Sequence, residues 1–444
     1  MSTELAEVPF TALEDSLRRL DEAVSPLVGI VGPVTHTTYT DDESSLVHVA
    51  CRLASGRRTV GERTVEYGGG VAPGPDRARA AAIGEALERY SGAFLPTTLR
   101  RTTAAELGPT AAPPERFALF HRRQHALPGF PFVPFTRDLH LHFVEGWSLA
   151  DGRPAWLPAQ LVYLRSPDPP ASAIGFPTSN GLACGATLEE AVLAGLLELV
   201  ERDAVMLAWN NRLSLPRLDW TEDEELLALD RRYFTGSGLS YSVLDGSVFL
   251  GIPAAIAVVH GPPAERTALA VGAGCAPTVA AAWLKALSEA FGVRRWLRAH
   301  TLIDPERTIE DPFEIASFDE HMLFYASHEH AKQAAFLDSS PRTTATRDVG
   351  PLTATTPRRL VEEVVGRLGR HDVTAYAVDV TAPDVRSLGL HVVRVVCTEL
   401  CALDVSHGAR YLGGRRLYHA AYEAGLASRP LQPTELNPLP HPFP

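Results

Sequence analysis

The chain has 444 residues with 41 basic and 53 acidic side chains, which gives a net charge of −12 at pH 7. Binding to nucleic acid or to an anionic membrane depends on basic patches, so this charge balance argues against both. No apolar run reaches the roughly 18 residues that span a bilayer, and the acidic start MSTELAEVPF lacks the basic region of a signal peptide. Five cysteines without a CxxC pair predict reduced, buried thiols in a cytoplasmic protein.

Hydrophobic patterning predicts alternating helices and strands in chain order. The expected helices cover residues 10–24, 76–94, 187–210, 279–300 and 358–372. Extended segments or strands are expected over residues 26–34, 63–70, 239–246, 253–261, 373–380 and 389–397. Residues 96–170 are proline-rich and irregular, and the polar stretch 303–357 predicts surface helices and loops. The pattern predicts an α+β fold with mainly antiparallel strands near the end of the chain.

Two of the expected helices carry the same charged pattern, Glu-x-x-Glu-Arg. The residues are Glu85, Glu88 and Arg89 in the first copy, and Glu198, Glu201 and Arg202 in the second. Residues three and four apart share one helical face, so each helix presents two carboxylates beside an arginine. Ordinary surface ion pairs would explain one such triplet. The neighbouring residues are apolar, however, so little of each helix is expected to face solvent. Four clustered carboxylates suit Mg²⁺, and the arginines suit phosphate oxygens, so the pattern predicts a metal-bridged nucleotide site.

Other residues near these helices are weaker candidates. Glu289 and Arg294 lie on the helix 279–300, although arginines at helix ends are more often solvated. Asn180, in the turn before the second acidic helix, offers an amide to a ligand or simply forms a tight turn. A Walker P-loop is absent, and lysine occurs only at positions 285 and 332, so phosphates would be held by arginines, backbone amides and metal ions.

The chain ends on NPLPHPFP, with proline at every second position. Each proline fixes φ and removes a donor, so the segment favours a preordered polyproline II rod. Such a rod loses little entropy when it is inserted into a groove, whereas a disordered tail is the commoner state of a terminus.

The segments GEALERYSG, SNGLACGATLEEAVLAGLLELVERDA and ALSEA..VRR, together with the terminal PHPFP, resemble the YcaO family and in particular its azoline-forming cyclodehydratases. The resemblance runs from about residue 25 to the end. It implies residues 1–60 as the N-terminal segment of the same unit, and 61–444 as a YcaO domain with a proline-rich C-terminus. The implied activity is ATP- and Mg²⁺-dependent conversion of Cys, Ser or Thr in a ribosomally made precursor peptide to thiazoline or oxazoline, as in antibiotic biosynthesis.

The resemblance also assigns roles to residues. Glu85, Glu88, Glu198 and Glu201 would hold Mg²⁺, and Glu190 would be a further acid of the nucleotide site. Arg89, Arg202 and Arg294 would contact phosphates, with Asn180 also at the nucleotide. Pro440, Pro442 and Pro444 would reach into the active site and help to organise cyclisation.

The chain departs from the family pattern at several neutral or polar positions. Ala81, Ala186, Ala194 and Gly292 replace polar residues, and the region of Val71 lacks a lysine. Weaker nucleotide binding is therefore expected, and a non-catalytic scaffold subunit stays open, as does thioamide or amidine formation. Few residues precede the resemblance, so a separate partner protein is expected to bind the leader of the precursor peptide. A homodimer stays open as well.

Overall fold

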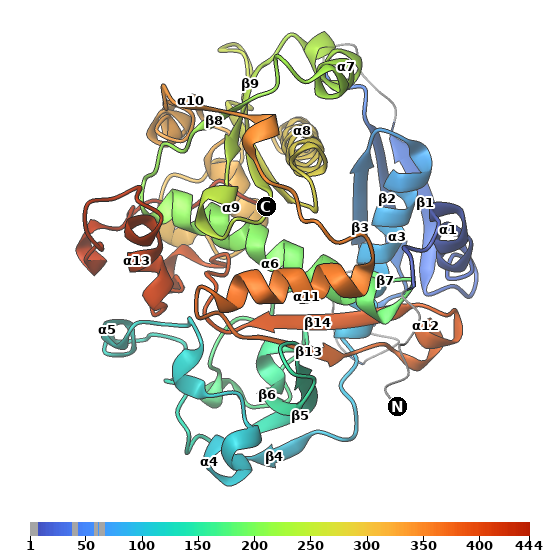
Figure 1. Ribbon diagram of the computed structural model, residues 1–444, viewed down its shortest axis with the longest axis vertical. Coiled ribbons are helices and arrows are strands. Elements are labelled where there is room, and N and C mark those ends of the chain that lie inside the picture. The colour runs from blue at the N-terminus through green and yellow to red at the C-terminus, as the bar shows by residue number, and fades with distance from the viewer. Residues whose placement is uncertain (1–7, 38–42, 57–60, 62–66) are drawn as a thin grey trace.

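In a computed structural model, which describes residues 8–37, 43–56, 61 and 67–444, three sheets pack with three long helices (Figure 1). The first sheet has the order β1-β2-β3 and is antiparallel throughout. Its strands are β1 (Val31–Thr37), β2 (Val47–Leu53) and β3 (Tyr67–Ala72). Part of the expected strand 63–70 lies outside the described residues.

The second sheet has the order β11-β10-β9-β8-β12, with only the β8–β12 pair parallel. Its strands are β8 (Arg217–Asp219), β9 (Ser240–Asp245), β10 (Ala254–His260), β11 (Leu269–Cys275) and β12 (Thr343–Ala345). Every residue of β11 is buried, and two of the long helices pack against this strand. A strand buried on both faces reads as a continuous apolar run, as LAVGAGC does.

The third sheet has the order β4-β5-β13-β14-β7, with β6 also paired to β5, and is antiparallel. Its strands are β4 (Arg100–Thr102), β5 (Leu141–Ser148), β6 (Pro154–Pro158), β7 (Leu182–Gly185), β13 (Ala375–Asp379) and β14 (His391–Cys397). The expected α+β fold with mainly antiparallel sheets is therefore confirmed.

Three long helices each follow a strand: α3 (Pro75–Gly92) follows β3, α6 (Leu188–Asn210) follows β7, and α8 (Val279–Ile303) follows β11. Proline starts α3, whereas threonine side chains cap α6 and α8. Glycines in the strands let the helices approach closely: a Cβ at Gly70 would lie 2.1 Å from the Ala78 carbonyl oxygen.

The remaining helices are α1 (Leu13–Asp21), α4 (Ala104–Leu107), α5 (Arg122–His125), α7 (Glu224–Tyr233), α9 (Phe318–Phe324), α10 (His328–Ala331), α11 (Pro357–Gly369), α12 (Pro383–Ser387) and α13 (Arg415–Glu423). The polar stretch 303–357, predicted as surface, includes α9, whose residues 321–324 are buried. That expectation is wrong for α9, because the C-terminal segment packs on this helix and removes it from water.

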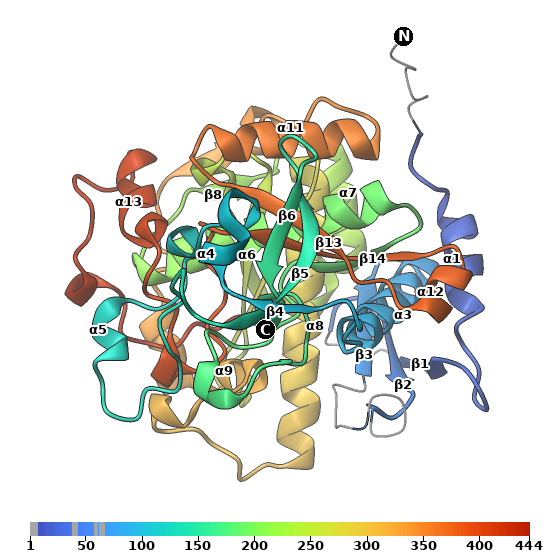
Figure 2. The same cartoon turned by 90° about the horizontal axis from the view of Figure 1, so that it is seen from below.

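The C-terminus lies near the middle of the outline in both views of the molecule (Figures 1 and 2). Among the described residues no helix is long and apolar enough to cross a membrane. The five cysteines are free, and four of them are buried.

Candidate active site

The three strand–helix units repeat one hydrogen bond. A glutamate in the middle of each helix accepts from a backbone N–H at the strand that precedes it, 16 or 17 residues earlier. The bonds join Glu85 to Gly69 at 2.5 Å, Glu198 to Gly181 at 3.2 Å, and Glu289 to Ala273 at 2.6 Å. The repeated geometry therefore brings one carboxylate from α3, one from α6 and one from α8 against the backbone in or beside the preceding strand.

The second glutamate of each Glu-x-x-Glu pair reaches instead to the next unit. Glu88 on α3 accepts from the N–H of Cys184 on β7 at 2.8 Å. Glu201 on α6 accepts from the N–H of Cys275 on β11 at 2.9 Å. These two bonds link the three units in order, and the five glutamates form one connected group, called here the glutamate group (Glu85, Glu88, Glu198, Glu201 and Glu289).

Three cations lie beside this group. Arg89 pairs with Glu85 at 2.7 Å, and Arg202 pairs with Glu198 at 2.9 Å, each one helical turn away. Lys285 on α8 donates to Glu201 at 2.8 Å. Lys285 was not predicted as a site residue, although its place one turn before Glu289 is a local signal.

Burial and mutual repulsion shift two of the carboxyl groups. Burial raises the pKa of Glu88 to about 8, and the charges of Glu198 and Glu85 act in the same direction. Burial also raises the pKa of Glu289 to about 7, assisted by the charge of Glu201. Near neutral pH these groups therefore favour a bound proton or a bound cation.

A cleft of about 650 Å³ lies between β2, β3 and α3 on one side and α8 on the other. Gly69, Lys285 and Glu289 line it, so it opens onto the glutamate group. The substituted positions Ala81 and Gly292 also line it. A Cβ at Gly292 would lie 3.1 Å from Val71 Cγ2, so a longer side chain at position 292 would have to displace Val71.

The structure places three other candidates away from this cleft. The buried Arg294 forms ion pairs with Glu43 at 3.2 Å and Glu265 at 2.7 Å. Glu190, near the start of α6, accepts from the N–H of Thr11 at 2.6 Å. Asn180 lines a smaller, separate cavity.

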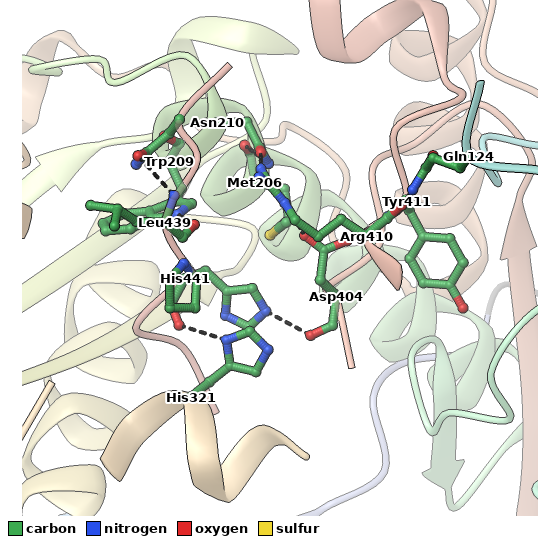
Figure 3. Close-up of polar contacts among 12 residues, drawn as sticks. Gln124, Met206, Trp209, Asn210, His321, Asp404, Arg410, Tyr411, Leu439 and His441 are labelled. Atoms are coloured by element: carbon green, nitrogen blue, oxygen red, sulfur yellow. Dashed lines mark hydrogen bonds and ion pairs between the residues drawn. The ribbon is translucent and has the colours of Figure 1, made fainter. Parts of the chain in front are cut away.

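The C-terminal segment runs back along α6 toward the glutamate group. It starts where the Asn437 N–H donates to the carbonyl of Asn210, at the end of α6, at 2.8 Å. Trp209 donates to the Leu439 carbonyl at 3.0 Å (Figure 3). The segment ends where Arg202 donates to the carbonyl oxygen of Pro444 at 3.2 Å.

His321 on α9 and Tyr325, the residue after that helix, hold the middle of this segment. Tyr325 donates to the Pro440 carbonyl at 2.6 Å. The ring of His321 stacks on that of His441 with 3.9 Å between centroids, and its Nδ1 lies 3.0 Å from the His441 carbonyl oxygen (Figure 3). Burial lowers the pKa of His321 to about 3 and also lowers that of His441, so both rings are neutral at pH 7. Residues 440–443, including Pro440 and Pro442, are buried.

A sequence model of the YcaO family, described as YcaO cyclodehydratase, ATP- and Mg²⁺-binding, matches residues 69–401. The chain belongs to the YcaO family. The glutamate group and α9 lie inside the matched residues, the β2 wall of the cleft precedes them, and the C-terminal segment follows them. The expected family is confirmed, and the expected cofactors ATP and Mg²⁺ are those that the description of the family gives.

Solved structures agree with this YcaO assignment. A heterocyclase in complex with substrate and cofactor has a TM-score of 0.81 and 25% identity, over 99% of this chain and 59% of that one. The heterocyclase TruD has a TM-score of 0.71 and 26% identity, over 99% of this chain and 55% of that one. The YcaO protein of Methanopyrus kandleri, bound with AMPPCP and Mg²⁺, shares the fold with a TM-score of 0.62 and 22% identity, over 88% of this chain and 91% of that one.

One curated relative is an uncharacterised protein from Rhizobium leguminosarum bv. trifolii, from the tfuA 3′ region. It is 30% identical over 211 residues, which is 42% of this chain and 49% of the relative. The chain thus spans about half the length of this relative, and less than two thirds of each of the two heterocyclases.

The donor set of this YcaO chain fits Mg²⁺. Carboxylate oxygens are its preferred protein ligands, and burial together with the neighbouring carboxylates raises the pKa values of Glu88 and Glu289. The backbone bonds engage one oxygen of each of Glu88, Glu201 and Glu289, which leaves the second oxygen of each to a cation. Within the described residues no three His, Cys, Asp or Glu side chains are grouped closely enough to hold a metal ion by themselves. The remaining ligands would thus come from water and phosphate.

Proposed function

We propose that this chain is an ATP- and Mg²⁺-dependent peptide cyclodehydratase. On a ribosomally made precursor peptide, the side-chain sulfur of Cys or oxygen of Ser or Thr adds to the preceding backbone carbonyl. The oxygen of that carbonyl then takes the γ-phosphoryl group of ATP and leaves as phosphate. One water is removed in total, its oxygen ending in the phosphate, and a thiazoline or oxazoline ring is formed.

The observation that carries the proposal is the position of the C-terminal segment. Arg202 contacts both Glu198 and the Pro444 carbonyl oxygen, so the end of this segment lies directly beside the glutamate group. A segment with no role at the site would have little reason to be buried there, since termini are usually loose. The two heterocyclases of similar fold support the same reaction class.

The roles of the glutamates and arginines follow from their chemistry. Glu85, Glu88, Glu198 and Glu201, joined by Glu289, would hold Mg²⁺. Bound Mg²⁺ would neutralise charge on the phosphates. Arg89 and Arg202 would orient phosphate oxygens, since phosphoryl transfer depends mainly on positioning and charge stabilisation. Lys285 would be released from Glu201 toward the cleft when a metal takes that carboxylate.

The C-terminal prolines would position the reactants, and only the end of the segment would lie at the reacting atoms. The Pro440 carbonyl is occupied by Tyr325, and Pro442 is buried, so these two residues set the path of the segment. Pro444 is the residue that reaches Arg202, and we propose that it orients the peptide carbonyl for attack. A separate partner protein would bind the leader of the precursor peptide.

The first test is calorimetric titration of the purified chain with ATP in the presence of Mg²⁺. We expect Mg²⁺-dependent binding that is lost in Glu198→Ala and in Glu201→Ala. Glu362→Ala, which removes an exposed carboxylate on α11, should bind ATP as the wild type does. No binding by the folded wild type, with its partner present, would instead indicate a scaffold subunit that lost its nucleotide contacts with the substitutions at Ala81, Ala186 and Gly292.

Ring formation is tested by mass spectrometry of a precursor peptide incubated with the chain, ATP and Mg²⁺. The expected product has lost one water for each ring. Exchange of a backbone oxygen for sulfur, or equal rates with and without the leader-binding partner, would contradict the corresponding part of the proposal.

A further inference from the structure

A second cavity, of about 90 Å³, lies at the end of β14, where that strand meets the turn before β7. Its lining includes Asn180 from the turn, Arg394 and Thr398 from β14 and the residue after it, and Tyr411. Phe176 and Thr178 at its margin are only half-buried, so the cavity is reached from the surface. Nothing in the reaction proposed above uses it.

Three polar groups in this lining, each on a different side chain, lack a hydrogen-bond partner. They are the Asn180 amide nitrogen, one terminal nitrogen of Arg394 and the Thr398 hydroxyl. The three residues are only 7%, 4% and 3% exposed, respectively. Buried donors are nearly always satisfied, so three unpartnered groups in one cavity point to a bound group. An amide nitrogen and a guanidinium only donate, and a hydroxyl can donate, so the missing partner is an acceptor.

The charge of the cavity decides the kind of acceptor. The other nitrogens of Arg394 donate to the carbonyl of Leu161 at 3.1 and 3.0 Å, and that carbonyl is neutral. The residues that line the cavity include no Asp or Glu. Burial lowers the pKa of Arg394 to about 10, with the charge of Glu198 acting in the opposite direction, and the guanidinium stays charged at pH 7. Within the cavity itself no carboxylate pairs with this buried charge, so an anion there fits better than a neutral acceptor.

Size and shape favour a carboxylate over other anions. A volume of about 90 Å³ equals the share of about three waters, which suits a carboxylate with one or two carbons. The planar guanidinium matches the planar carboxylate, and the rest of the lining, including Phe117, Leu199 and Val396, is apolar and suits a short carbon chain. We propose that this cavity is a carboxylate-binding site in which Arg394, Asn180 and Thr398 donate to one carboxylate group.

The cavity is coupled to the glutamate group through one turn. Asn180 directly precedes Gly181, whose N–H holds Glu198, and Leu199 follows Glu198. A carboxylate that fixes Asn180 would therefore also fix the amide that orients Glu198. The group could belong to a free small carboxylate or to a bound peptide.

The probe for this site is acetate, with the uncharged acetamide as its matched control. Calorimetry of the purified full chain should show acetate binding that is at least tenfold tighter than acetamide binding. Arg394→Met should weaken acetate binding at least tenfold and Thr398→Val about threefold, whereas Arg358→Met, a surface arginine on α11, should leave it unchanged. If Arg394→Met does not fold, acetate binding by Thr398→Val tests the proposal, because this variant keeps the shape of the side chain and removes only the hydroxyl.

A second titration separates the two sources of the group. A short peptide with a free C-terminal carboxylate that binds more tightly than acetate, and loses this advantage on amidation, identifies a peptide as the occupant. Equal affinities identify a free small carboxylate. Acetate and acetamide binding equally, or acetate binding unaffected by both cavity variants, would show that the cavity holds only water and would overturn the proposal.

Discussion

Two helices carry the same Glu-x-x-Glu-Arg motif, yet the fold gives the two copies different surroundings. On α3, the side chains of Glu85 and Arg89 are 36% and 25% exposed, and Arg89 donates to the Tyr67 carbonyl of the strand beside it. On α6, the side chains of Glu198 and Arg202 are 20% and 19% exposed, and Arg202 donates to the last residue of the chain.

The difference lies in what covers each helix. The C-terminal segment lies along α6, and β3 lies along α3. The same motif therefore anchors a strand in one place and meets a second, distant segment in the other. We expect the copy on α6 to be closer to the reacting atoms and the copy on α3 to contribute mainly charge.

The largest effect should come from removing the end of the C-terminal segment, which contacts α6 and not α3. Deletion of Pro442–Pro444 removes the partner of Arg202, and misplacement of a reacting group by an ångström can cost about 100-fold in rate. Ring formation, followed by mass spectrometry, should fall at least that far, while calorimetry should show unchanged ATP binding. Ring formation at the wild-type rate would show that the C-terminal segment has no part in the reaction.

The matched pair Arg202→Gln and Arg89→Gln tests the comparison directly. Arg202→Gln should lower kcat for ring formation by about 100-fold, the loss typical of one preorganised donor at a developing charge. Arg89→Gln, at the more exposed copy, should cost about tenfold and act mainly on KM for ATP. Equal losses in kcat would mean that the two copies contribute alike and that the copy on α6 lies no closer to the reacting atoms.

The carboxyl of Glu88 should make stability depend on pH in the absence of Mg²⁺. Its pKa is about 8 in the folded protein against 4.5 for an ordinary Glu, so the folded state holds the proton more tightly than the unfolded state does. Stability should therefore fall as pH rises from about 5 to about 8. Glu88→Gln should flatten this slope and stabilise the metal-free protein at pH 8 by about 1–2 kcal/mol.

Denaturant unfolding at several pH values measures this effect, with the surface variant Glu362→Gln as control. Addition of Mg²⁺ to the wild type should remove most of the slope, because the cation replaces the proton. A slope that is the same in the wild type and Glu88→Gln would place the titrating group elsewhere.

The smallest effect concerns the anchoring of the C-terminal segment. Tyr325→Phe removes the hydroxyl that donates to the Pro440 carbonyl and should lower the free energy of unfolding by about 1 kcal/mol. Ring formation should slow only a few-fold, since Trp209 and His321 still hold the segment. Tyr422→Phe, at an exposed tyrosine on α13, should change neither quantity, and a similar loss there would remove the specific role of Tyr325.

Much of the local structure could be predicted from the sequence. The long helices α3, α6 and α8 were expected within a few residues of their observed ends, because hydrophobic patterning along the chain is a local signal. The acidic faces of α3 and α6 follow from the three-residue spacing of their glutamates. The resemblance to the YcaO family then linked these faces to ATP and Mg²⁺.

Other features of the site could not be predicted, because they join residues that are far apart in the chain. Lys285 meets Glu201 across 84 residues, and Cys184 meets Glu88 across 96. The resemblance assigned Arg294 to the phosphates, yet Glu43 and Glu265 hold its guanidinium. The polar α9 was expected at the surface, yet its residues 321–324 are buried, since His321 and the adjoining Tyr325 contact the C-terminal segment.

The sequence by itself thus determined which helices form and which of their faces carry charge, since both depend on spacing within one or two turns. The tertiary structure alone decided which charge meets which partner. Close glycine contacts pack each long helix on its own strand, and the bonds from Cys184 to Glu88 and from Cys275 to Glu201 join the units β3–α3, β7–α6 and β11–α8. Only that packing selects the amides, the lysine and the C-terminal proline that contact each carboxylate or arginine.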